Sequence, residues 1–531
     1  MDDKDNGHGS GRRLKLDLTW ILVLVQFIVI LFLIIALFAY ILSRPIEFHT
    51  QSTKSYEPLA SYEPVVNTFH RRARVSTTSI PPTTTTTTTT KIEFNEDVNP
   101  QSESSETYDS FHAAVLSESA TCSEVGRSIL VRGGNAIDSA IATSFCMMMA
   151  APSKASLGGG MLMLVREPNG TMKTVIARES APMLTNVEEL HKSPQLSKTG
   201  PKSIAVPGML NGLYRAFENF SSGRISWKQI VIPTLQQCAK GFEYSKKLER
   251  EVEVLSKKNP SITKILDCSN LAMTFSDITD FENPLEGFAI PPIGYLSQAD
   301  FEDYESDINT ARCAIIDSDV KVCGPGPPSL FSVVVNSYLL TKNMSNIEKV
   351  NEAVKSNINA AYRISDPIFN QASRKHADDL MKSAKKSAYQ KDMNVDLRED
   401  GSTTISVVDE NNMTVSVILS LGDSFGSEVL NPAGFLMNNK LRYFDLKSDN
   451  QPQSLQPGKV PTTMTTPFLV LKNDVVLAVT GDADLVSMVH LLRDLTHRNY
   501  DASIATPTLY LSNSAIILKS HPSNKYSVTG Y

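Results

Sequence analysis

The sequence is poor in the side chains that bind metals and in the positive charge that binds polyanions. It has nine histidines among 531 residues and a formal net charge of −6. No group of histidines and cysteines has the spacing of metal ligands. The negative balance argues against a nucleic-acid partner. We therefore expect no metal, no cofactor and no nucleic acid.

The sequence also lacks a Cys-x-x-Cys pair, although it contains six cysteines. An even number suits disulfide bonds if the compartment is oxidising. Cys122 and Cys146 lie near opposite ends of two predicted helices, which an antiparallel arrangement would bring within bridging range. The other four cysteines allow three connectivities, and the sequence leaves these open: Cys238, Cys268, Cys313 and Cys323.

A long apolar run lies near the N-terminus. Residues 20–42 are apolar apart from Gln26 and are long enough to span a bilayer. Four lysine or arginine residues precede the run and Arg44 follows it, which predicts a cytoplasmic N-terminus. A cleaved signal peptide is the alternative, but the run is too long and residues 42–45 make a poor cleavage site. We predict a cytoplasmic tail (1–18), a transmembrane signal anchor (19–42) and a single-pass type II plasma-membrane protein with an extracellular ectodomain.

Residues 43–107 have the composition of a stalk. An unbroken threonine run, 83–90, lies among serine and acidic residues, which cannot build a core and suit a disordered, O-glycosylated spacer. Four glycosylation sequons follow, as expected for an ectodomain, although any one of them can arise by chance: Asn169, Asn219, Asn343 and Asn412.

Helical patterns dominate the first half of the globular region. Apolar spacing predicts a helix that ends at Gly133 and a second helix from Ala136 to Pro152. Residues 161–165 and 171–176 form a predicted hairpin, closed by Arg178. Further helices are expected within 208–217, 227–242 and 347–390, and strands at 469–471, 475–479, 509–511 and 515–518. This order of elements predicts an α/β fold built as a layered sandwich.

One further hairpin carries a candidate nucleophile. Residues 401–408 and 413–421 have the apolar density of paired strands around a turn. Ser402 follows Gly401 at the head of the first strand, which fits an N-terminal nucleophile that cuts the preceding peptide bond and then uses its freed amine as a base. The same composition is common at the start of ordinary strands, so both interpretations stay open.

Many short segments resemble the gamma-glutamyltransferase (glutathione hydrolase) family in the family's own order. They lie between about residue 112 and residue 490, at 122–138, 158–160, 178–182, 205–208, 366–367, 406–409, 425–427, 438–439 and 457–459. The resemblance implies an N-terminal-nucleophile αββα sandwich whose precursor cuts itself into two subunits that stay together. The large-subunit-like region would be 108–401 and the small-subunit-like region 402–531. The anchor and the spacing of Cys122 and Cys146 resemble the animal members, which implies a disulfide between these two cysteines.

The resemblance also implies roles for five residues. The scissile bond is Gly401–Ser402, and Ser402 attacks the γ-glutamyl amide of glutathione before the acyl group passes to water or an acceptor amine. Ser420 takes the place of the threonine that hydrogen-bonds the nucleophile. Arg178 matches the arginine that grips the substrate α-carboxylate, and Thr463 keeps one hydroxyl of a serine pair that assists it.

Other positions depart from the family pattern. Thr404 stands in place of a histidine, Gly422 in place of an asparagine, and Tyr443 in place of the acid that takes the substrate ammonium. Lys440 adds a cation near that acid's position, and the twin oxyanion glycines fall on residues 484–485. Loss of a charged contact costs roughly 1.5–3 kcal/mol. Loss of one oxyanion donor costs roughly 100- to 1000-fold in rate.

Three functions follow as alternatives. The first is a glutathione hydrolase or γ-glutamyltransferase with a weak, eroded site. The second is an inactive pseudoenzyme whose ectodomain binds a partner. The third is an N-terminal serine hydrolase of changed specificity, in which Lys440 and Arg442 suit an acidic substrate end better than an ammonium.

Overall fold

The computed structural model describes residues 105–109, 113–286, 288, 290–382, 384, 397–482, 484–497, 508–512, 515–519 and 527–530. All of them belong to the second of two compact units, Phe94–Tyr531. The predicted tail, membrane anchor and most of the stalk lie outside these residues. In the described part of the chain, no helix is long and apolar enough to cross a membrane.

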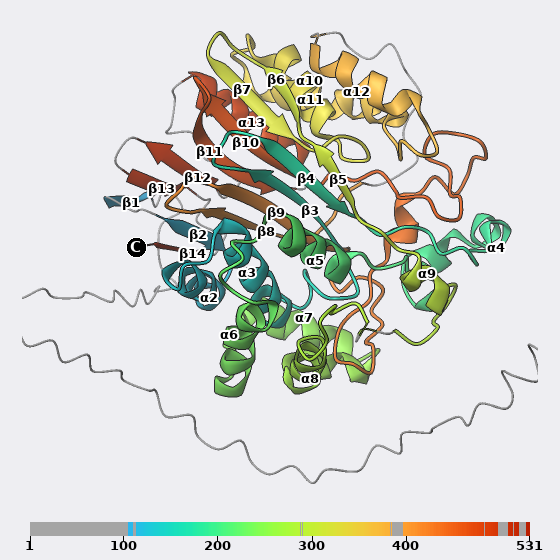
Figure 1. Cartoon of the computed structure of the whole chain (residues 1–531). Helices are drawn as coiled ribbons and strands as arrows, with labels where there is room; N and C mark the ends of the chain where they lie inside the picture. Colours follow the sequence, from blue (N-terminus) through green and yellow to red (C-terminus); the bar gives the residue numbers. More distant parts are fainter. Residues whose placement is uncertain are drawn as a thin grey trace, which may run out of the picture. The chain divides into compact units, whose positions relative to one another are not determined.

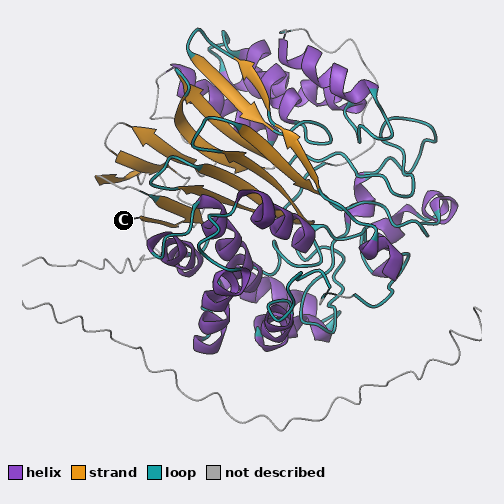
Figure 2. Ribbon diagram, in the orientation of Figure 1, coloured by secondary structure: helices purple, strands orange, loops and turns teal. Residues whose placement is uncertain are grey.

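Two seven-stranded sheets form the centre of the fold, and every strand pairing in them is antiparallel (Figures 1 and 2). The first sheet has the order β1 (Ser105–Asp109), β13 (Ala515–Lys519), β12 (Thr508–Ser512), β11 (Val475–Asp482), β10 (Thr466–Lys472), β7 (Val320–Gly324) and β6 (Arg312–Ile315). The second has the order β14 (Ser527–Gly530), β2 (Ala114–Ser117), β8 (Gly401–Val408), β9 (Thr414–Gly422), β3 (Gly160–Arg166), β4 (Met172–Ala177) and β5 (Asp307–Thr310).

The sheets pack face to face between two layers of helices. Leu116 and Leu164 of the second sheet share an apolar cluster with Leu469 and Val479 of the first, so the two sheets touch directly. The outer face of the second sheet packs on α2 (Ala120–Val131), α3 (Ala136–Ala150), α5 (Met209–Phe220), α6 (Trp227–Lys240) and α8 (Ser269–Asp277). The outer face of the first packs on α10 (Phe331–Thr341), α11 (Ile347–Asn357), α12 (Ala372–Lys382) and α13 (Leu485–His497). The remaining helices are α4 (Val187–Lys192), α7 (Lys246–Ser256) and α9 (Gln298–Glu302). The predicted αββα layering is therefore present.

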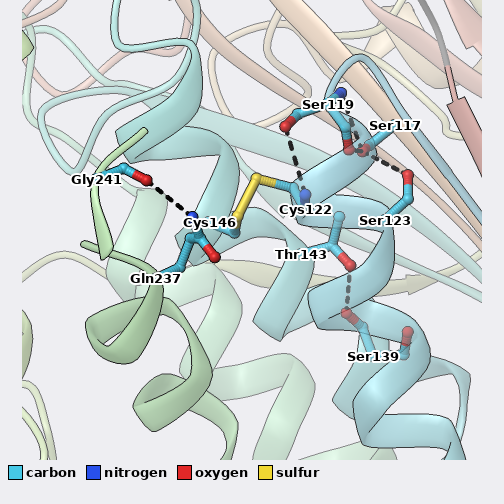
Figure 3. The surroundings of a disulfide bond; sticks show 9 residues. All are labelled: Ser117, Ser119, Cys122, Ser123, Ser139, Thr143, Cys146, Gln237 and Gly241. Carbon is cyan, nitrogen blue, oxygen red and sulfur yellow. Dashed lines mark hydrogen bonds between the residues drawn. A yellow bond between two sulfur atoms is a disulfide. The ribbon is translucent and has the colours of Figure 1, made fainter. Parts of the chain in front are cut away.

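The first two predicted helices are α2 and α3, and they form a tight pair. Gly126 permits their close approach, because a Cβ there would come within 2.2 Å of the Thr143 hydroxyl. Asn135 begins α3 by accepting hydrogen bonds from two backbone N–H groups in its first turn. A disulfide of 2.03 Å joins Cys122 on α2 to Cys146 on α3 (Figure 3). This is the pair that the sequence led us to expect.

The structure pairs the remaining four cysteines. Cys238 is bonded to Cys268, and Cys313 to Cys323. The second of these bridges joins β6 to β7 at the edge of the first sheet. The structure therefore selects one of the three connectivities that the sequence left open.

The candidate hairpin is β8 and β9, at the centre of the second sheet. Asp409 shapes its turn by accepting hydrogen bonds from the N–H groups of Asn411 and Met413, both at 2.9 Å. Asp409 also accepts a 3.0 Å hydrogen bond from the N–H of Ala136, which ties the turn to the start of α3. The turn of the hairpin is thus held in place by α3, which lies far from it in the sequence.

The expected division into a helical first half and a strand-rich second half is too simple. β2 to β7 precede Gly401, and each sheet contains strands from both sides of the Gly401–Ser402 bond. The sequence pattern missed six strands of only four or five residues each, which are too short to show a clear periodicity: β1, β2, β5, β6, β7 and β14. The first of these begins at Ser105, within the last residues of the stretch that we expected to be a disordered stalk.

Candidate active site

Ser402 begins the regular part of β8, next to Ser420 on β9. The two residues are direct partners across the strands, and an irregularity in the pairing lies between Gly401 and Ser402. The Ser402 hydroxyl donates a 2.8 Å hydrogen bond to the carbonyl oxygen of Glu399. Gly401 has no room for a side chain, since a Cβ there would lie 2.0 Å from the carbonyl oxygen of Asp423. The glycine before the serine is therefore required by packing.

Four side chains converge on the carboxylate of Glu399, three residues before Ser402. Arg178, just after β4, places Nη2 3.0 Å from Oε2 of Glu399. Lys440, in a short 3₁₀ turn, pairs through Nζ with the same oxygen, and the hydroxyl of Ser420 donates to it at 2.8 Å. Thr463, ahead of β10, donates its hydroxyl to the other oxygen, Oε1. The carboxylate has a polar partner on each oxygen.

This cluster is buried, and its charges are strongly coupled. Glu399 is 3% exposed, Arg178 1% and Lys440 0%. Burial alone would raise the pKa of Glu399, but the positive charges of Arg178 and Lys440 and the hydrogen bonds of Lys440 and Thr463 outweigh it and lower the pKa to about 2. Burial lowers the pKa of Lys440, and the neighbouring Arg178 lowers it further. The carboxylate is therefore held ionised between two cations.

The backbone around each cation is fixed by further buried contacts. The hydroxyl of Tyr304 donates to the carbonyl oxygen of Arg178 at 2.7 Å, and Glu179 Oε2 lies 3.5 Å from Arg178 Nε. Asn438 accepts a 3.0 Å hydrogen bond from the N–H of Lys440 and donates to the carbonyl oxygen of Gly158 at 2.8 Å. Gly158, in the triple-glycine segment at 158–160, thus helps to position Asn438 and, through it, the backbone of Lys440. Within the described residues, Nε and Nη1 of Arg178 have no hydrogen-bond acceptor.

Tyr443, which the resemblance places at the position of the ammonium-binding acid, has a hydrogen-bonded phenol. Tyr443 donates from its hydroxyl to the carbonyl oxygen of Arg398 at 2.9 Å and approaches Asp423 Oδ1 at 3.1 Å. Asp423 also accepts hydrogen bonds from Arg442 and, at 2.9 Å, from Asn439. The nearby Asp423 carboxylate is consequently engaged by a cation, an amide and a phenol.

The local structure requires a glycine at position 422, where the resemblance implies an asparagine. Its φ of +99° lies in the region that favours glycine, and a Cβ there would come within 2.3 Å of Asn439 Oδ1. The N–H of Gly422 donates to the hydroxyl of Ser420 at 3.0 Å. Any other residue at position 422 would therefore clash with Asn439 and strain the backbone.

Residues 484–485, on which the resemblance places the oxyanion glycines, lie at the start of α13. Asp484 accepts hydrogen bonds at 2.7 Å from both the N–H and the hydroxyl of Ser487, so its carboxylate caps the helix. Leu485 is buried in the core under the first sheet. The hydroxyl of Thr404 donates to the carbonyl oxygen of Gly481 at 2.9 Å, which joins β8 to β11 just before this helix. The structure therefore commits the charge of Asp484 to the end of the helix.

A cavity of about 490 Å³ adjoins the Glu399 cluster, and Arg178 is the member of the cluster that lines it. Its lining includes Ser180, Tyr304, Asp366 and Gly458, but not Ser402, Ser420 or Lys440. The space around Ser420 and Lys440 is filled by Glu399 itself. We therefore locate the candidate site at the Glu399 cluster and regard the cavity as adjoining it.

The remaining predicted sites lie on the surface. The four sequon asparagines are all exposed: Asn169, Asn219, Asn343 and Asn412. Among the described side chains, no group of three histidine, cysteine, aspartate or glutamate residues could hold a metal ion.

The sequence identified Arg178, Ser402, Ser420 and Thr463 as site residues, and the structure brings three of them onto one carboxylate. The sequence analysis did not identify Glu399 as a site residue. A glutamate followed by the exposed Asp400 has the composition of a solvated loop, so no local signal marks it.

An αββα sandwich with a glycine–serine step at the head of a central strand has the architecture of the N-terminal-nucleophile hydrolases. A crystal structure of cephalosporin acylase from Bacillus halodurans has the same fold, with a TM-score of 0.68 and 15% sequence identity over 83% of this chain and 99% of that one.

The sequence comparisons are more specific. The family profile described as gamma-glutamyltranspeptidase matches residues 122–280 and 282–483. Glutathione hydrolase 2 of Arabidopsis thaliana is 26% identical over 70% of this chain and 74% of its own length. Glutathione hydrolase 7 of Homo sapiens is 25% identical over 67% of this chain and 62% of its own. The chain belongs to the gamma-glutamyltranspeptidase family.

Proposed function

We propose that this protein is a self-cleaving N-terminal serine hydrolase that opens amides of acyl groups carrying a terminal carboxylate, with weak activity on the γ-glutamyl amide of glutathione. The observation that carries the proposal is the convergence of Arg178, Lys440 and Thr463 on the carboxylate of Glu399, three residues from Ser402. A site that binds one carboxylate beside the nucleophile can bind another once Glu399 has left.

Self-cleavage would begin with attack of the Ser402 hydroxyl oxygen on the carbonyl carbon of Gly401. The C–N bond breaks, the amide nitrogen takes the hydroxyl proton and becomes the α-amine of Ser402, and an ester joins Gly401 to the serine oxygen. Water then hydrolyses this ester and releases the Gly401 carboxylate. Because each sheet contains strands from both sides of the cut, the two subunits would remain associated.

The mature site would repeat this chemistry on a substrate. The freed amine of Ser402 accepts the hydroxyl proton as the oxygen attacks the substrate carbonyl, and the leaving amine takes that proton. Water or an acceptor amine then removes the acyl group. Arg178 and Thr463 would hold the terminal carboxylate, and Ser420 would orient the nucleophile from the neighbouring strand.

Electrophoresis of the purified ectodomain under denaturing conditions tests the first step. Cleavage at Gly401–Ser402 yields a fragment of about 130 residues, 402–531, and Ser402→Ala abolishes it. A wild-type chain that stays intact would reject the enzymatic proposal and favour the pseudoenzyme, because the amine of Ser402 would remain in a peptide bond. A cut chain is then assayed with γ-glutamyl-p-nitroanilide, for which we expect measurable but slow turnover.

We also propose that the protein is a type II plasma-membrane ectoprotein. The predicted anchor at 19–42, the exposed sequon asparagines and the three disulfides support an oxidising, glycosylating compartment. Surface biotinylation of intact cells and a mobility shift on treatment with an N-glycosidase would both be positive. An unglycosylated protein that surface labelling does not reach would refute the assignment.

A further inference from the structure

The two cations of the site meet on one oxygen atom. Arg178 Nη2 and Lys440 Nζ both contact Oε2 of Glu399, while Oε1 is bound by the hydroxyl of Thr463. A single carboxylate therefore satisfies both charges and the hydroxyl. Lys440 is oriented for this role, since its Nζ also lies 3.1 Å from the Ser420 hydroxyl and 4.9 Å from the ring centre of Tyr443.

The same geometry is unfavourable for an ammonium next to that carboxylate. A second cation would lie beside Lys440 in a site that excludes water, where like charges repel strongly. Of the nearby carboxylates, Asp423 is engaged by Arg442, Asn439 and Tyr443. Glu179 lies 3.5 Å from Arg178 Nε, and among the described residues neither of its oxygens has a hydrogen-bond partner. An ammonium directed at Asp423 would have to break one of its three contacts, and at any position beside Arg178 and Lys440 it would meet their positive charges.

Glu399 itself has the chemistry that the site accepts. Its side chain presents two methylene groups and a carboxylate, and its own nitrogen is an uncharged peptide amide. Every oxygen of this carboxylate is bound, and the Ser420 hydroxyl donates to it at 2.8 Å. The uncut chain thus shows which kind of acyl end fits between Arg178, Lys440 and Thr463.

We propose that this pocket selects acyl groups that end in a carboxylate and carry no ammonium on the adjacent carbon, the glutaryl rather than the γ-glutamyl class, and that Lys440 is the residue that determines this specificity. The inference rests on the proposed function, because Glu399 must leave the pocket after cleavage at Gly401–Ser402.

The test compares two chromogenic amides on the self-cleaved protein. Glutaryl-p-nitroanilide and γ-glutamyl-p-nitroanilide have the same leaving group and chain length and differ only by the α-ammonium. We expect kcat/KM to be at least about tenfold higher for the glutaryl compound, since like-charge contacts at a site discriminate strongly. Equal values, or a preference for the γ-glutamyl compound, would overturn the inference and leave the proposed hydrolase intact.

A variant pair assigns the preference to Lys440. Lys440→Gln removes the cation and should reduce the ratio of the two kcat/KM values by about tenfold, mainly through KM. Lys447→Gln makes the same substitution at an exposed lysine and should leave the ratio unchanged. A ratio that is the same in both variants and in the wild type would remove Lys440 from the explanation.

A binding experiment separates failure of the inference from failure of the proposed function. If neither anilide is cleaved, the hydrolase proposal fails, but the pocket can still be probed in the full chain carrying Glu399→Ala together with Ser402→Ala. The first substitution vacates the pocket and the second keeps the chain uncut. Glutarate should then raise the melting temperature of this variant more than L-glutamate does at equal concentration. An equal or larger effect of L-glutamate would contradict the selectivity.

Discussion

Neutralising Glu399 is the most direct test of the buried charge cluster. In the uncut chain, Glu399→Gln would leave Arg178 and Lys440 facing each other without the carboxylate that both now contact. A pKa held at about 2 rather than the usual 4.5 corresponds to about 3 kcal/mol of folding free energy. Breaking one partner of a buried ion pair costs a similar amount, about 3–5 kcal/mol. We expect the variant to lose about 3 kcal/mol of unfolding free energy at neutral pH.

The pH dependence supplies an independent measure of the same interaction. The folded-state pKa of Glu399 lies below its unfolded value, so the stabilisation is fully present above about pH 4.5 and is lost as the pH falls towards about 2. The Glu399→Gln chain lacks this ionisation. Its unfolding free energy should therefore fall less steeply than that of the parent between these two pH values.

The assay is urea denaturation at several pH values, with Ser402→Ala in every protein so that none is cut. Asp400→Asn is the matched control, because Asp400 is adjacent in sequence but exposed, and it should cost less than about 0.5 kcal/mol. If Glu399→Gln is as stable as the parent and has the same pH slope, the inferred coupling of Glu399 to Arg178 and Lys440 is wrong.

Two further predictions concern the carboxylate contact and the helix pair. Arg178→Lys keeps the positive charge but loses the planar guanidinium, which can bind both oxygens of a carboxylate. KM for a carboxylate-bearing anilide should therefore rise roughly 10- to 100-fold, with a smaller change in kcat. Steady-state kinetics on the cut protein measures both constants, and an unchanged KM would contradict the prediction. Replacing both Cys122 and Cys146 by alanine opens a loop with a sequence separation of 24, and the chain-entropy relation gives a loss of about 3.5 kcal/mol. Denaturant unfolding of this double variant should show the loss, and a midpoint equal to the parent's would exclude a stabilising role for the bridge.

The sequence by itself determined those features that depend on residues close together along the chain. The apolar spacing of α2 and α3, the strands on either side of the turn at Asp409 and the order of the family segments are all readable without a structure, because each depends on residues within one or two elements. The sequence also shows the glycine before Ser402, but it does not show why a glycine is needed there. The structure supplies the reason, because a Cβ at Gly401 would lie 2.0 Å from the carbonyl oxygen of Asp423.

Only the tertiary structure decided what the site contains. Arg178, Glu399, Lys440 and Thr463 come from four separate segments. They meet at one carboxylate because the packing of the two sheets brings the segments beside the ends of β4, β8 and β10 together with a short turn. No periodicity connects such residues, and Glu399 looks in sequence like its exposed neighbour Asp400. Burial separates the two: a charge removed from water must find partners, and those partners are supplied by the fold.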